Sequence, residues 1–132
     1  MIFRAVAECW GEIDANSTAG YVYFVASNHD DARHRLHMAC TLWFNGHQYD
    51  AYNLNSEHEL FRDSTDDVFE DAHLLEAGCI GQRVVFTYPG HSENTQLALF
   101  LPPKELQRLE AAFARAKAYA ESYTEHTETI EG

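Results

Sequence analysis

The dipeptide Asn45-Gly46 constrains the fold of this chain more than any other short segment, because it lies between two runs in which apolar and polar residues alternate. A two-residue type I′ turn needs positive φ at both central positions, which Asn and Gly tolerate well. We therefore predict a β-hairpin that turns at Asn45-Gly46 and pairs residues 35–44 with residues 47–54. In the first run, every second residue is apolar: Leu36, Met38, Cys40, Leu42 and Phe44.

Other segments also have the composition or the alternation of strands. Some are rich in β-branched and aromatic residues, and in others one side of the strand is apolar and the other polar. These segments are residues 2–10, 20–26, 82–88 and 96–101. Together with the hairpin they predict about six strands.

A short acidic helix is expected in the middle of the chain. Ser64 is a suitable N-cap residue, and Val68, Ala72 and Leu75 recur at helical spacing. Gly78 follows at a position where a helix commonly ends.

A long C-terminal helix is expected from about Pro103 to Ser122, since proline is well tolerated in the first turn. Its predicted buried stripe consists of Leu106, Leu109, Phe113, Ala116 and Ala120. The polar residues 124–132 are predicted to form a frayed tail.

These elements predict a single α+β domain spanning residues 1–132. We expect a mainly antiparallel sheet of about six strands, with the short acidic helix and the long C-terminal helix packed on one face. The sequence shows no repeat, linker or low-complexity block, so no domain boundary is proposed.

Composition excludes several classes of function. The net charge is −12, and the nine basic residues are scattered, which argues against direct binding of nucleic acid or of an anionic membrane surface. No apolar run approaches the roughly 20 residues that span a bilayer, and the N-terminus does not resemble a signal peptide. We expect a cytoplasmic protein whose three cysteines, Cys9, Cys40 and Cys79, are small buried thiols.

No motif in the sequence indicates catalysis. There is no Gly-x-Ser-x-Gly, no His-Glu-x-x-His and no phosphate-binding glycine loop, and we predict no cofactor and no catalytic residue. The strongest chemical alternative is a small metal-dependent hydrolase that uses the region of His29, His34 and His37.

The acidic segment 57–76 is the main candidate for function. It holds eight carboxylates and a single base, Arg62. The repulsion among clustered like charges destabilises the fold, and solubility alone does not require such a cluster. Aromatic residues on strand faces could anchor a partner beside it. The candidate partner-binding residues are Glu57, Glu59, Asp63, Asp66, Asp67, Glu70, Asp71, Trp43 and Tyr49.

The sequence thus favours a small, non-enzymatic, acidic protein that binds a basic protein or complex. Carboxylates that replace phosphates would inhibit a nuclease or a nucleic-acid-handling complex, as phage inhibitors of host defence and toxin immunity proteins do. In size and acidity the chain is similar to secretion chaperones, although those begin with a helix and this chain begins with a strand. A chaperone-like or oligomeric subunit, including a homodimer, is therefore a second alternative.

Overall fold

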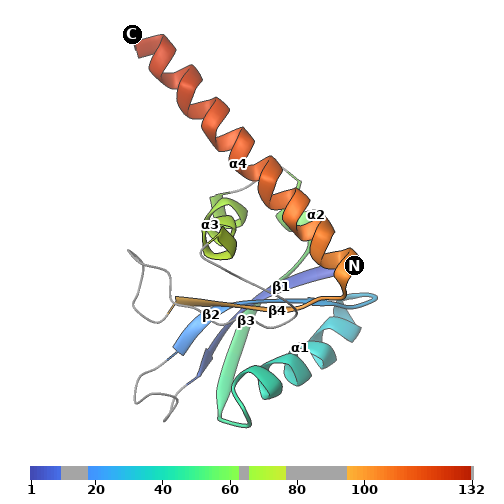
Figure 1. Ribbon diagram of the computed structural model, residues 1–132. Helices are drawn as coiled ribbons and strands as arrows, with labels where there is room; N and C mark the ends of the chain where they lie inside the picture. Colours follow the sequence, from blue (N-terminus) through green and yellow to red (C-terminus); the bar gives the residue numbers. More distant parts are fainter. Residues whose placement is uncertain (10–17, 63–65, 77–94, 132) are drawn as a thin grey trace.

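The computed structural model describes residues 1–9, 18–62, 66–76 and 95–131. Its four strands form one sheet, with α1 on one side and the other helices on the opposite side (Figure 1). The elements follow one another as β1 (Ile2–Cys9), β2 (Thr18–Val25), α1 (His29–Trp43), β3 (Tyr49–Ser56), α2 (Glu57–Leu60), α3 (Asp66–Glu76), β4 (Thr95–Phe100) and α4 (Pro103–Glu131). Among the described helices, none combines the length and apolarity needed to cross a bilayer.

The strand order in the sheet is β3-β1-β2-β4. β1 is antiparallel to both of its neighbours, so that Phe3 lies opposite Phe24 of β2 and opposite Ser56 of β3. β4 is parallel to β2, with Tyr21 opposite Leu97. A parallel neighbour requires a long crossover, and here the intervening chain includes α1, β3, α2 and α3.

The sheet has fewer strands than predicted. The strands predicted at 2–10, 20–26 and 96–101 are confirmed as β1, β2 and β4. The prediction of about six strands is wrong, since the described part of the chain contains four. The strand predicted at 82–88 lies outside the described residues.

The strand predicted at 35–44 is a helix instead, and the predicted hairpin is therefore wrong. Asn28 caps α1, because its side chain accepts a hydrogen bond from the Asp31 N–H at 2.9 Å. Asp30 and Asp31 lie in the first turn, where the helix dipole favours negative charge. The buried residues of α1 recur at helical intervals: Ala32, Leu36, Ala39, Cys40 and Trp43.

Asn45 and Gly46 have the positive φ angles that the sequence predicts, 56° and 83°, but they terminate a helix. The Gly46 N–H donates to the Thr41 carbonyl at 3.0 Å, a bond that satisfies an otherwise unpaired carbonyl at the end of α1. The following strand, β3, pairs with β1 rather than with the segment before the turn.

Both faces of the sheet are buried: the acidic helix α3 and the C-terminal helix α4 share one face as predicted, and α1, which was predicted from the sequence to be a strand, covers the other. Successive side chains of a strand point to opposite faces, and on β1 both sets are largely buried. Phe3, Ala5 and Ala7 pack toward α1, while Ile2 packs with the cluster that includes α3 and α4. The buried cluster that holds residues of the sheet, α3 and α4 fixes the positions of these two helices relative to the sheet.

The long C-terminal helix is present, and it is longer than predicted. Leu109, Phe113 and Ala116 of its predicted stripe are buried, whereas the tail predicted from residue 124 continues as helix to Glu131. α3 also matches its prediction, with Val68 and Ala72 buried against the same cluster. The distal end of α4 projects beyond the other elements in Figure 1.

Candidate functional site

Asp71, predicted to contact a partner, is a core residue. Its side chain is fully buried, and its Oδ2 accepts a hydrogen bond from Arg4 Nη1 at 3.1 Å and another from the Tyr23 hydroxyl. The Arg4 guanidinium also lies over the Tyr21 ring, 4.7 Å from its centroid. Burial, followed by the nearby charge of Asp71, raises the pKa of Tyr23 well above its usual value. Asp71 therefore joins α3 to β1 and β2 and is not available to a partner.

Glu57 likewise has an internal role. Its side chain accepts a hydrogen bond from the Ile2 N–H at 2.9 Å and forms an ion pair with Arg108 of α4. Arg108 also pairs with Glu105, and the hydrogen bond with Glu105 is the chief reason that the pKa of Arg108 is raised. Glu57 therefore ties the start of α2 to β1 and α4.

Glu59 and Glu70 are exposed, as a partner-binding role requires. Glu59 also accepts a hydrogen bond from the Ser56 N–H at 3.2 Å, and this bond is the main cause of its lowered pKa. Asp66 and Asp67 lie in the first turn of α3, while Asp63 lies outside the described residues.

The two predicted aromatic anchors do not lie beside these acids. Trp43 is 3% exposed and stacks on Phe44, with a centroid distance of 4.7 Å. The hydroxyl of Tyr49 donates to the His37 carbonyl at 3.2 Å. Both aromatic residues pack on the α1 side of the sheet, whereas α3 lies on the opposite side. The predicted residues therefore do not form one surface.

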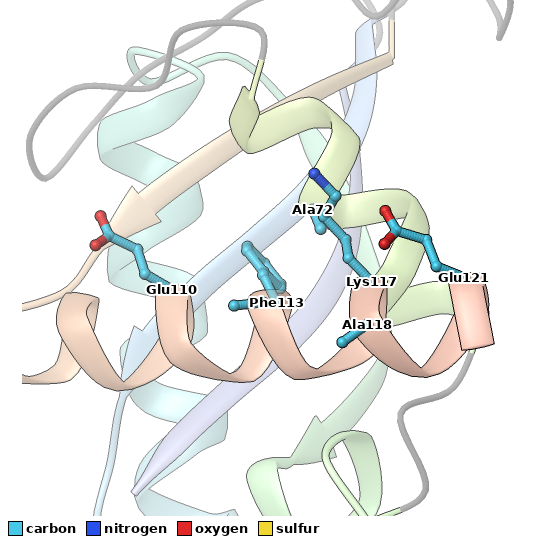
Figure 2. A pocket seen from close by; sticks show the side chains of 7 residues that line it. Ala72, Glu110, Phe113, Lys117, Ala118 and Glu121 are labelled. Atoms are coloured by element: carbon cyan, nitrogen blue, oxygen red, sulfur yellow. The ribbon is translucent and has the colours of Figure 1, made fainter.

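A groove between α3 and α4 combines apolar residues with two acids and one lysine (Figure 2). It has a volume of about 350 Å³, and its lining comes from α4 except for Ala72 of α3. Glu110, Phe113, Lys117 and Glu121 rise from one side of α4 toward α3. The remaining lining residues are Ala114 and Ala118.

The acids of this groove were not among the sequence candidates. Glu110 and Glu121 are eleven residues apart, about three helical turns, and that spacing is the signal that indicates a shared face. Both are exposed at the rim, whereas Phe113 is buried. The arrangement could accommodate an apolar side chain of a binding partner against Phe113 and a basic side chain of the same partner beside Glu110 or Glu121.

The three histidines of the hydrolase hypothesis, His29, His34 and His37, lie on α1, and two of them have other contacts. His29 Nε2 is 3.4 Å from Glu59 and its ring packs against Phe3, while His37 is joined to Tyr49. Within the described ranges, no group of three His, Cys, Asp or Glu side chains could hold a metal ion. Burial raises the pKa of Cys9, and that of Cys40 to about 12, so neither thiol has the properties of a nucleophile.

Comparison with protein families, with curated proteins and with solved structures finds no match to this chain.

Proposed function

We propose that this protein is a non-enzymatic binding protein for a basic partner protein, and that the partner docks in the groove between α3 and α4. The observation that carries the proposal is the composition of this groove, which has an apolar floor and two exposed carboxylates, Glu110 and Glu121, against one base, Lys117. A basic amphipathic helix fits such a surface, since its apolar face fills the groove while its Lys and Arg side chains reach the rim.

The distribution of ion pairs supports a cationic partner. Four of the six described arginines already pair with carboxylates of the same chain, and these pairs use five acids: Asp30, Asp31, Glu57, Asp71 and Glu105. Most of the net charge of −12 therefore lies outside the described arginine pairs. Excess charge of one sign accelerates association with a partner of the opposite sign.

The sequence of α4 extends this negative character away from the body of the protein. After Lys117, α4 contains four glutamates and neither lysine nor arginine. A nuclease or another nucleic-acid-handling protein has a basic surface that these carboxylates could occupy in place of phosphates. Inhibition of such a partner is the activity we propose.

The experiment compares two single charge reversals with the same change in net charge. Glu121→Lys alters the groove, and Asp50→Lys alters an exposed acid on β3. Partners captured from the source cell at low salt are then purified and titrated with each variant. We expect Glu121→Lys to weaken binding about tenfold and Asp50→Lys to have a much smaller effect.

A third variant tests the apolar floor without changing charge. Ala114→Gln adds volume at an exposed position in the groove and should weaken the same complex. If both charge reversals weaken binding equally and Ala114→Gln has no effect, net charge alone governs the interaction and the groove assignment fails.

Self-association is a second candidate function, favoured by a separate observation. Met38 and Leu42 on α1 are 63% and 61% exposed, an unusual placement for large apolar side chains close together. They border a groove of about 350 Å³ that also includes Phe100 and Pro102. A second copy that covers this apolar groove would form a homodimer.

A further inference from the structure

Arg62 and Arg115 stand apart from the other described arginines. Arg4, Arg33, Arg35 and Arg108 each pair with a carboxylate of this chain. In the part of the chain that the structure describes, no carboxylate is within ion-pair distance of Arg62 or Arg115, and both are exposed. The two nevertheless line the same groove.

This groove lies between the α2 region and α4, on the other flank of α4 from the acidic groove. Its volume is about 490 Å³, and its lining is completed by Glu57, His58 and Phe61. Arg115 is seven residues after Arg108, two helical turns, so both arginines are on the flank of α4 that faces α2. The acidic groove is lined by Ala72 of α3 and by other residues of α4, so the two grooves lie on different flanks of this helix.

The local charge of the groove is positive despite the acidity of the whole protein. Glu57 is the acid that lines it, and its carboxylate is already bonded to the Ile2 N–H and to Arg108. The guanidinium groups of Arg62 and Arg115 therefore supply an excess of positive charge.

We propose that this groove binds a small phosphorylated compound that carries a planar ring, with the phosphate between Arg62 and Arg115. A guanidinium group offers several N–H donors in a planar fork that matches phosphate oxygens. Phe61 is half-buried and lines the groove, so its ring provides an apolar surface for the organic part of the ligand. The volume lies within the range of about 300–1,000 Å³ for small-molecule sites.

This proposal is independent of the proposed protein partner, since it rests on other residues and on the opposite flank of α4. The test uses the full chain, with adenosine monophosphate as the probe and adenosine as the probe that lacks phosphate. Isothermal titration should give a Kd of about 1 mM or tighter for the monophosphate and no measurable binding of adenosine.

Two double variants remove the same amount of positive charge. Arg62→Gln/Arg115→Gln alters the groove, whereas Arg33→Gln/Arg35→Gln alters two exposed arginines of α1. The first should weaken monophosphate binding at least about tenfold, and the second should leave it within about twofold of the wild-type value. Circular dichroism of each variant confirms that it is folded before titration.

A further variant, Arg62→Lys/Arg115→Lys, keeps the charge but loses the planar donors and should bind with intermediate affinity. The proposal is overturned if the wild-type chain does not bind the monophosphate, if adenosine binds equally well, or if the groove variant binds as tightly as the α1 variant.

Discussion

Arg4 Nη1 lies 3.1 Å from Asp71 Oδ2, and the two side chains are 4% and 0% exposed, so this ion pair between β1 and α3 is buried. The residues are 67 positions apart in the chain. The pair places one negative charge of the acidic segment in the core, where Arg4 compensates it, whereas Glu70 of the same helix is exposed.

Replacing one partner of this ion pair should destabilise the protein strongly. Asp71→Asn keeps the size of the side chain but removes the buried carboxylate charge that faces the Arg4 guanidinium, and we expect a loss of about 3–5 kcal/mol in the free energy of unfolding. Urea denaturation followed by circular dichroism measures the loss. Asp50→Asn, at an exposed position, should change the same quantity by less than about 0.5 kcal/mol.

The double variant Arg4→Met/Asp71→Leu separates the ion pair from the packing around it. Removing both charges together should cost much less than the sum of the two single substitutions. Additive losses would mean that the two side chains do not interact in the folded protein.

The thiol of Cys40 should be almost unreactive in the folded protein. Burial raises its pKa to about 12, so at pH 8 its thiolate fraction is about three orders of magnitude below that of an ordinary cysteine. In a Cys9→Ala/Cys79→Ser chain, whose remaining thiol is Cys40, modification by a disulfide reagent should be slow in buffer and fast in urea. Rapid modification of Cys40 in buffer would contradict its burial.

Asp31 should contribute stability that depends on pH. The Ser27 N–H donates to its carboxylate at 2.8 Å and Arg35 donates at 2.9 Å, and the backbone bond is the main cause of its lowered pKa. Since the folded pKa is below the unfolded one, the stabilisation is complete above the unfolded value and is lost as the pH falls through the folded value. Asp31→Asn should therefore destabilise the chain at pH 7.

The same substitution should have little effect at a pH below the folded pKa, where the wild-type carboxyl is also neutral. Urea unfolding of both proteins at neutral pH and at a pH low enough to protonate this carboxyl in the folded protein makes the comparison. An equal loss at the two pH values would assign the effect to packing rather than to charge.

Self-association through α1 should depend on its exposed apolar residues. We expect the wild-type chain to form a dimer at high concentration and Met38→Lys/Leu42→Lys to be monomeric by light scattering, because lysine makes the covered surface unfavourable. The variant should unfold at nearly the wild-type urea concentration, since both positions are exposed. A wild-type chain that stays monomeric rules out this interface.

Local pattern predicted several elements well. β1, β2 and β4 follow from their alternation or β-branched composition, and α4 begins at Pro103 as its sequence indicates. The stripe of Val68 and Ala72 in α3 is also buried as predicted. In each of these segments the apolar residues follow a single repeat, that of a strand or that of a helix. Residues close together in the sequence were therefore enough to predict the element.

The segment that became α1 satisfied two periods at once. Leu36 and Cys40 fit both the alternation of a strand and the spacing of a helix. The choice depended on which further residues were buried: Ala39 and Trp43 are buried in the structure, whereas Met38 and Leu42 are exposed. Packing against the sheet therefore decided the element, and Asn45-Gly46 suited either outcome.

The amino-acid sequence by itself determined the α+β composition, the acidity of the chain and the positions of its clearest elements, because these depend on residues close together along the chain. Only the tertiary structure decided that Asp71 and Glu57 are internal, that both faces of the sheet are covered, and that Arg62 and Arg115 line one groove. These are contacts between segments that are distant in the sequence. The residue type alone does not show whether a carboxylate or a guanidinium is surrounded by water or paired with an opposite charge in the folded protein.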